Sequence, residues 1–292
     1  MSKSMESRIE AQDPQILIAA LGVAAGFSSG LLGIGAGILL IPALSAFMGY
    51  PIKRAMGTSL VAALFIALAG VLAEWEAGEA QIRWTWVLLL GAGSVAGAAL
   101  GRRIGWRIPD TPVRLALAGA LLLSSFRMFA SSLSPRGSVA NMIAATPAGE
   151  QLLVLSLGIL TGLTSVRFGL GNGIVTLAGL ALFCADMPFN AIRGISLAAI
   201  IVPAAVGAHQ HRRLGNVDAR LARALVPPGL AGAVLGVIAA DFLPVRLCQM
   251  AFGVLLVVVV VRLLSEVLHP GRVSSWSSPV GRGGPRADAN AP

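Results

Sequence analysis

The sequence predicts an all-α polytopic membrane protein with two inverted-topology repeats, each a glycine-interrupted helical hairpin plus three transmembrane helices. The first observation is composition: 56% of the 292 residues are hydrophobic and 12% are charged, against about 25% charged in an average soluble domain. The second is that long apolar stretches recur from residue 14 to residue 268. The third is a glycine-rich motif that occurs twice, between loops of unequal basic charge.

The apolar stretches are typical of helices, because runs such as residues 60–73 and, apart from Arg262, residues 255–264 are apolar on all sides. Transmembrane barrel strands alternate apolar and polar residues instead. The net charge of +9 comes largely from short loops between these stretches, so it indicates membrane topology and gives no reason to expect nucleic acid. Cys184 and Cys248 lack metal-ligand spacing and are expected to be buried thiols.

A helix needs about 20 residues to span a bilayer. Six full-length spans are predicted, at 57–74, 84–101, 113–131, 194–209, 221–240 and 246–265. Two further apolar regions, 14–49 and 151–185, are too long for one span and contain glycines in the middle, so each is interpreted as two shorter helices. Residues 1–13 are expected to be a retained cytoplasmic N-terminus, and residues 269–292 a disordered cytoplasmic tail.

The two interrupted regions align at an offset of 136 residues. The glycines that coincide are Gly33, Gly35 and Gly37 with Gly169, Gly171 and Gly173. Further matches pair "GTSL" (57–60) with "GISL" (194–197), and "GAALG" (97–101) with "GAVLG" (232–236). The chain is therefore interpreted as a duplication, with repeats at 14–131 and 151–268 joined by an external connection at 132–150.

Loop charge predicts the orientation, since Lys and Arg concentrate in short cytoplasmic loops. Basic residues mark three loops as cytoplasmic, near residues 53–54, 102–114 and 212–223. The loops that hold Glu74, Asp186 and Asp241 are poor in basic residues and are assigned to the outside. Equivalent loops then face opposite sides, and both termini are cytoplasmic. Five crossings per repeat, or three plus a re-entrant hairpin, fit equally well.

Interrupted helices at corresponding places in inverted repeats indicate a substrate site near the middle of the membrane. Glycine allows the break, and free amides at the start of the next half-helix attract anions. The candidate site residues are Gly33, Gly35, Gly37, Thr58, Ser59, Arg167, Gly169, Gly171, Asn172, Gly173 and Ser196.

Each candidate also has a structural interpretation. The glycines could serve tight helix packing, which is the favoured interpretation for "GAALG" and "GAVLG". Hydroxyl groups often bond to their own helix backbone. Arg167 either faces the interior, where it could bind an anion, or extends to the membrane interface.

Carboxylates are absent from the middle of the predicted spans, which disfavours a cation pathway. No nucleophile elbow, HExxH motif or Walker loop is present, so no enzyme, metal or cofactor is expected. The sequence favours a secondary transporter of a small anion that works by alternating access, with a passive anion channel as the alternative and a membrane-embedded enzyme as a weaker third. The expected partners are the anion and the lipid bilayer, and a homo-oligomer stays open.

Three segments resemble the sulfite exporter TauE/SafE family of membrane transporters. They are "GFSSGLLGIGAGILLIPAL" (26–44), "AMGTSL" (55–60) and the second copy "GLTSVRFGLGNGIVTLAGL" (162–180). The resemblance covers residues 15–265 and implies a bacterial inner-membrane transporter of sulfite or another organosulfur or organic acid anion. The second copy departs from the pattern, with Arg167-Phe168 aligned to Leu31-Leu32 and Ala178 in place of Pro42.

Overall fold

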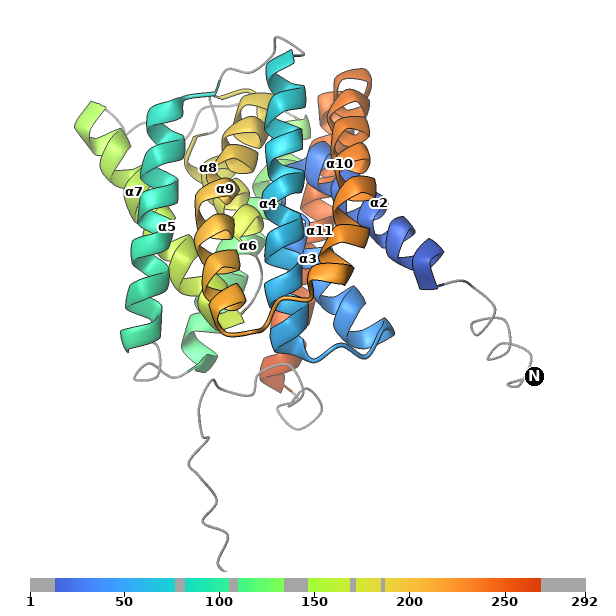
Figure 1. Ribbon diagram of the computed structural model, residues 1–292. Helices are drawn as coiled ribbons and strands as arrows, with labels where there is room; N and C mark the ends of the chain where they lie inside the picture. The colour runs from blue at the N-terminus through green and yellow to red at the C-terminus, as the bar shows by residue number, and fades with distance from the viewer. Residues whose placement is uncertain are drawn as a thin grey trace, which may run out of the picture.

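A computed structural model describes residues 14–76, 82–104, 110–133, 147–168, 172–184 and 187–268 of the chain. Within these ranges every regular element is helical (Figure 1). The helices are α2 (Pro14–Leu32), α3 (Gly37–Pro42), the π-helix η1 (Ala43–Phe47), α4 (Ile52–Glu76), α5 (Trp84–Ile104), α6 (Asp110–Leu133), α7 (Pro147–Phe168), α8 (Asn172–Phe183), α9 (Phe189–Arg213), α10 (Ala219–Phe242) and α11 (Val245–Leu268). The predicted N-terminal segment, C-terminal tail and most of the 132–150 connection lie outside the described residues.

Eight of the described helices are long and apolar enough to cross a membrane, namely α2, α4, α5, α6, α7, α9, α10 and α11. All six predicted full-length spans are confirmed, and each helix extends beyond its predicted span at one or both ends. The chain is therefore a multi-pass helical membrane protein.

The two interrupted regions differ from the expectation of paired short helices. In each region the first helix is long, with 19 residues in α2 and 22 in α7. The second is short, with 12 residues in α8 and 6 in α3, which continues into η1 at Pro42. Proline has no amide hydrogen and cannot donate a helical hydrogen bond, so the change to π-helix at this residue has a local cause.

Glycine packing joins the helices into pairs. A Cβ on Gly26 would lie 2.1 Å from the carbonyl oxygen of Gly229, and one on Gly97 would lie 2.1 Å from that of Ile159. Gly232 and Gly236 approach the backbone of α2 in the same way. The packing role predicted for "GAALG" and "GAVLG" is thus confirmed. Such close approach is how membrane helices gain van der Waals contact in the absence of a hydrophobic driving force.

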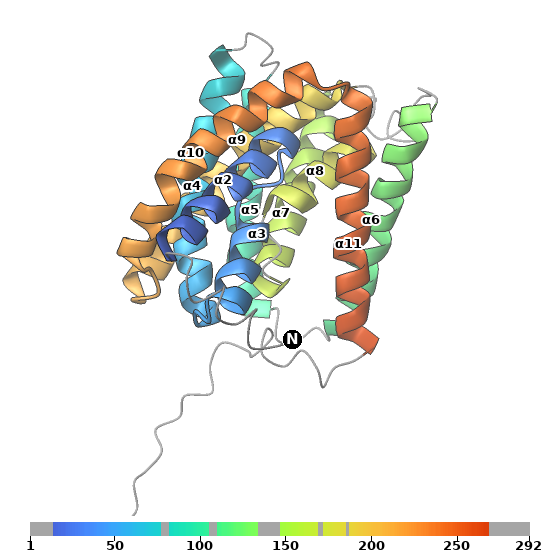
Figure 2. The ribbon, with the colours of Figure 1, turned by 90° about the vertical axis from the view of Figure 1, so that its right-hand side faces the viewer.

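The pairs surround a central antiparallel couple. Gly57 lies against His211 and Gly70 against Leu197, so α4 and α9 run in opposite directions. In Figure 1, α5 and α7 lie on one side of this couple, and α2 and α10 lie on the other. Figure 2 shows α6 beside α11 at the edge of the bundle.

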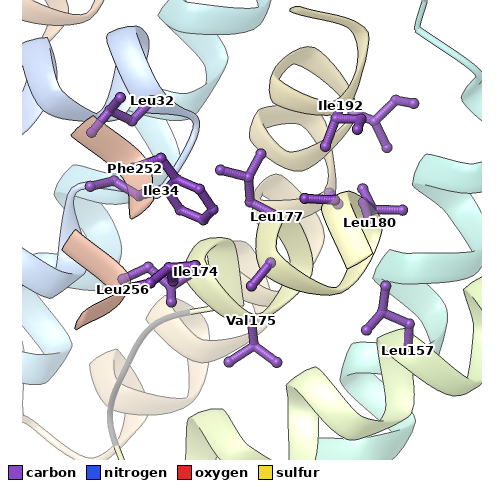
Figure 3. Packing of buried hydrophobic residues seen from close by; sticks show 14 of the residues in the cluster. Leu32, Ile34, Leu157, Ile174, Val175, Leu177, Leu180, Ile192, Phe252 and Leu256 are labelled. Atoms are coloured by element: carbon purple, nitrogen blue, oxygen red, sulfur yellow. The ribbon is translucent and has the colours of Figure 1, made fainter. Parts of the chain in front are cut away.

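The short helix α8 lies at the centre, and every residue from Gly173 to Ala181 is buried. In Figure 3 its Ile174 and Leu177 face Ile34, which follows α2, and Phe252 of α11. A helix of 12 residues that is apolar all round belongs inside a bundle. Its position brings the start of α8 to the interruption after α2.

Replacement of Gly26 by leucine should destabilise the protein, because the new Cβ would overlap the α10 backbone. Overpacking of this kind costs about 1–3 kcal/mol. The melting midpoint and monodisperse yield of the detergent-purified variant measure the effect. Gly119→Leu is the matched control, since a Cβ at this exposed position of α6 meets nothing within 4 Å. Equal stability of the two variants would contradict the packing described here.

Candidate functional site

The first interruption requires glycine at two positions. Gly33 and Gly35 have φ angles of 72° and 78°, in the left-handed region that side chains disfavour. The Gly33 amide closes the last turn of α2 by donating to the carbonyl oxygen of Ser29 at 2.7 Å. The chain then runs without helical structure until α3 begins at Gly37.

Ser196 of α9 fixes this interruption. Its hydroxyl donates to the carbonyl oxygen of Gly33 at 2.8 Å, and the carbonyl oxygen of Gly173 lies 3.3 Å away. Ile34 and Gly173 are in backbone contact, because a Cβ on Gly173 would lie 2.2 Å from the carbonyl oxygen of Ile34. The structure therefore brings Gly33, Gly35, Gly173 and Ser196 together, from three elements distant in sequence.

The remaining glycines of the predicted site are less constrained or not described. Gly37 is half-buried, and a Cβ there would meet nothing within 4 Å. Gly169 and Gly171 lie outside the described residues. Arg167 is in the last turn of α7 and Asn172 begins α8, but their side chains are also outside the description.

Thr58 and Ser59 lie at the other end of α4 from Glu74 and do not contact the first interruption. The Thr58 hydroxyl accepts a hydrogen bond from the amide of Asp218 at 3.0 Å, and Gly57 packs on the carbonyl oxygen of Asn216. Ser59 donates to the carbonyl oxygen of Met56 in its own helix. The contacts of "GTSL" thus hold the turn that starts α10, where Asp218 caps the helix.

A buried ion pair adjoins the first interruption. The Nε of Arg193 in α9 lies 2.6 Å from Oε1 of Glu74 in α4, with side-chain exposures of 0% and 2%. The Arg193 backbone and its Cγ lie against Gly33, within 3.0–3.2 Å of where a Cβ would stand. A full charge is therefore placed beside the interruption.

Sequence reasoning missed this pair because both predicted spans were too short: the first ended too early and the second began too late. The predicted spans ended at residue 74 and began at residue 194, which assigned Glu74 to an outer loop and omitted Arg193. The helices extend further, to Glu76 in α4 and from Phe189 in α9. The expectation that the outer loop holds Glu74 is wrong. Opposite charges at the facing ends of two predicted spans were the available signal.

A second carboxylate stands near the same guanidinium. Asp241, at the end of α10, has Oδ1 3.5 Å from Nη2 of Arg193 and a side chain that is 28% exposed. This distance is beyond a normal hydrogen bond. Among the described residues, neither Nη1 nor Nη2 has a hydrogen-bond partner.

The bundle and its interrupted helices define a class: a multi-pass membrane protein with non-helical backbone buried in its interior, as in many transporters. Comparison with known proteins gives the family. The chain matches the family described as Sulfite exporter TauE/SafE over residues 3–128 and 153–285, and it belongs to that family of membrane transporters. No solved structure matches it significantly.

Individual relatives agree with this assignment. A protein of Xylella fastidiosa (strain 9a5c) named "Probable membrane transporter protein" is 30% identical over 249 residues, which is 82% of this chain and 90% of the relative. "Probable membrane transporter protein YdhB" of Bacillus subtilis (strain 168) is 26% identical over 62% of this chain and 72% of its own.

Removal of the Ser196 hydroxyl should loosen the interruption, since Ser196→Ala deletes the donor to Gly33. A buried hydrogen bond contributes about 0.5–1.5 kcal/mol, and the unpaired carbonyl adds to the cost. Thermal unfolding in detergent measures the change. Ser28→Ala serves as the control, because Ser28 bonds only to its own helix backbone at Ala24 and Ala25. A Ser196 effect no larger than the Ser28 effect would argue against the anchoring role.

Glu74→Ala should be strongly destabilising, because it leaves the buried Arg193 charge with only the more distant carboxylate of Asp241. Such a loss costs about 3–5 kcal/mol. The matched control is Glu150→Ala, which breaks the exposed Arg83–Glu150 pair and should cost about 0–1 kcal/mol. Comparison of melting midpoints tests the difference. Near-equal midpoints for the two variants would show that loss of the buried pair costs no more stability than loss of the exposed pair.

Proposed function

We propose that the chain is a secondary transporter of a small anion, namely sulfite or another organosulfur or organic acid anion, that works by alternating access. The substrate site lies between the two interruptions. Its residues are those predicted from sequence around the breaks: Gly33, Gly35, Gly37, Arg167, Gly169, Gly171, Asn172, Gly173 and Ser196. Thr58 and Ser59, also predicted, are left out, because Thr58 holds the turn before α10 and Ser59 bonds within α4. The observation that carries the proposal is the convergence of the Gly33–Gly35 interruption, the start of α8 and Ser196 inside the bundle.

Helix pairing supports the inverted repeat. Contacts advance together along α2 and α10, from Gly22 near Leu225 to Gly30 near Val237, so this pair is parallel. The pair α5 and α7 is parallel as well, from Gly93 near Leu155 to Gly101 near Leu163. If α2 corresponds to α7 and α10 to α5, each pair is the counterpart of the other. The antiparallel α4 and α9 then correspond to each other, as a two-fold axis in the membrane plane requires.

The environment of the first interruption favours an anion. The helical hydrogen bonds of α3 begin with the amides of Leu39 and Leu40, which donate to Ala36, so the preceding amides are outside this ladder. The carboxylate nearest to the interruption, Glu74, is held by Arg193. The ion pair thus balances the charge of Glu74, and the amides outside the ladder can donate to an anion.

The relatives support transport as the activity. The family is described as Sulfite exporter TauE/SafE, and the relatives from Xylella fastidiosa and Bacillus subtilis are named as membrane transporters. Loop charge supports a bacterial inner-membrane location with both termini in the cytoplasm. We expect the anion and the lipid bilayer to be the partners, and a homo-oligomer is compatible with the fold.

Flux through proteoliposomes tests the function and separates it from a passive channel. A transporter should move labelled sulfite with saturable kinetics, and a gradient of one anion should drive another uphill by exchange or coupling. A channel gives flux that only follows the gradient. Flux that never saturates and never runs uphill would favour the channel. Absence of flux for sulfite, sulfonates and carboxylates alike would reject the proposed substrate class.

Gly35→Val should reduce sulfite flux at least about tenfold if the interruption forms the site. The residue needs its positive φ, and a Cβ there would press on Ile200 at 3.0 Å. The matched control is Gly49→Val, which has the same backbone requirement at φ 66° but meets nothing within 4 Å. Flux per folded protein should fall for Gly35→Val well below Gly49→Val. Equal flux would place the site elsewhere.

A further inference from the structure

Arg193 is the largest fully buried side chain among the described residues. A buried guanidinium normally has all of its donors satisfied, because an unpaired charged donor in a low-dielectric interior is costly. Here only the Nε donor is used, by Glu74 at 2.6 Å. The donors on Nη1 and Nη2 lack partners within the described part of the chain. The nitrogens Nη1 and Nη2, called the open edge below, therefore keep unused hydrogen-bond donors.

Structural ion pairing does not account for the open edge. Structural arginine–carboxylate pairs are frequently bidentate, with the carboxylate across two guanidinium nitrogens. Glu74 instead bonds through Nε, which leaves the donors on Nη1 and Nη2 without a hydrogen bond. Asp241 forms an ion pair with Nη2 at 3.5 Å but no hydrogen bond, and its carboxylate stays partly in solvent.

The backbone and the Cγ of Arg193 lie at the proposed transport site. Arg193 and Ser196 are three residues apart on α9, so both face the same side of the helix. Ser196 holds the carbonyl oxygen of Gly33, and Gly33 packs on Arg193 itself. The side chain that carries the cation therefore starts beside the same backbone interruption as the rest of the proposed site.

We propose that Arg193 binds the transported anion, with Nη1 and Nη2 donating to two oxygens of an oxyanion such as sulfite, a sulfonate or a carboxylate. This inference rests on the proposed function and names the residue that recognises the substrate class. Glu74 is a positioning residue that fixes the guanidinium through Nε. The planar fork of two nitrogens matches two oxygens of one anion, so the site should favour oxyanions over chloride.

Asp241 acts as a competitor of the anion. It is the partly exposed carboxylate of the cluster, at the end of α10, and so it lies between the buried guanidinium and the solvent. An anion that reaches Nη2 approaches this carboxylate and is repelled by it. Loss of the Asp241 charge should therefore strengthen anion binding, whereas a structural role would predict no gain.

The test uses the full-length protein purified in detergent, with sulfite as the probe. Sulfite affinity is measured from the rise in melting midpoint with concentration, and flux is measured in proteoliposomes. Arg193→Lys keeps the charge but loses the fork, and it should weaken sulfite binding at least about tenfold. Asp241→Asn should tighten it by about threefold or more. Arg83→Met is the matched control: it removes an exposed arginine from an ion pair outside the cluster and should leave affinity unchanged.

A double variant without either buried charge serves as the control for single variants that fail to fold. Arg193→Met combined with Glu74→Gln removes both buried charges together, and it should fold and fail to bind sulfite. Wild-type affinity in this double variant or in Arg193→Lys, with wild-type flux intact, would overturn the assignment of Arg193 but leave the transport function standing. Weaker binding in Asp241→Asn would also overturn it. A wild-type protein that neither binds nor moves any of the three oxyanion classes would instead reject the proposed function.

Discussion

The rest of the structure depends on one constraint: backbone that leaves the helix within a membrane must find its hydrogen bonds inside the protein. The chain leaves helix α2 at Gly33. Its carbonyl oxygen there is satisfied by Ser196, and the stretch that follows lies against Gly173. Two other elements must therefore reach the same point, which explains why α8 and the first half of α9 are buried on all sides. The interruption is not a local irregularity, because the central packing is built around it.

Glycine-lined helix crossings hold the outer elements against this centre. Between lipid-exposed helices there is no hydrophobic driving force, so close backbone approach must supply the contact energy. The pairs α2 with α10 and α5 with α7 meet in this way, each through glycines on both helices. The same glycines that mark sequence repeats are thus the contacts that keep α2 in place. A long α2 held along its length can end abruptly at Gly33 without fraying.

Most of the helical architecture could be predicted, because a span is a property of about 20 consecutive apolar residues. The glycine interruptions were also visible, and the structure places the first at Gly33–Ala36. What periodicity could not show were contacts between distant residues. Thr58 supports the turn before Asp218 although its motif resembles that of Ser196. The Glu74–Arg193 pair was missed for a different reason. The hydropathy pattern predicts that a span ends at the first charged residue, whereas a charged residue with a partner can lie inside the helix.

The ion pair also makes the two halves chemically unequal. At the offset of 137 residues that aligns Gly57 with Gly194, Met56 stands opposite Arg193, and His211 stands opposite Glu74. An inverted arrangement would place these counterparts at the other end of α4 and α9, where the cation of Arg193 has no equivalent. The buried ion pair would then lie near one membrane face only. Such asymmetry makes affinity differ between the two open states, but it leaves the direction of net flux to the gradients, since binding free energies cancel over a complete cycle.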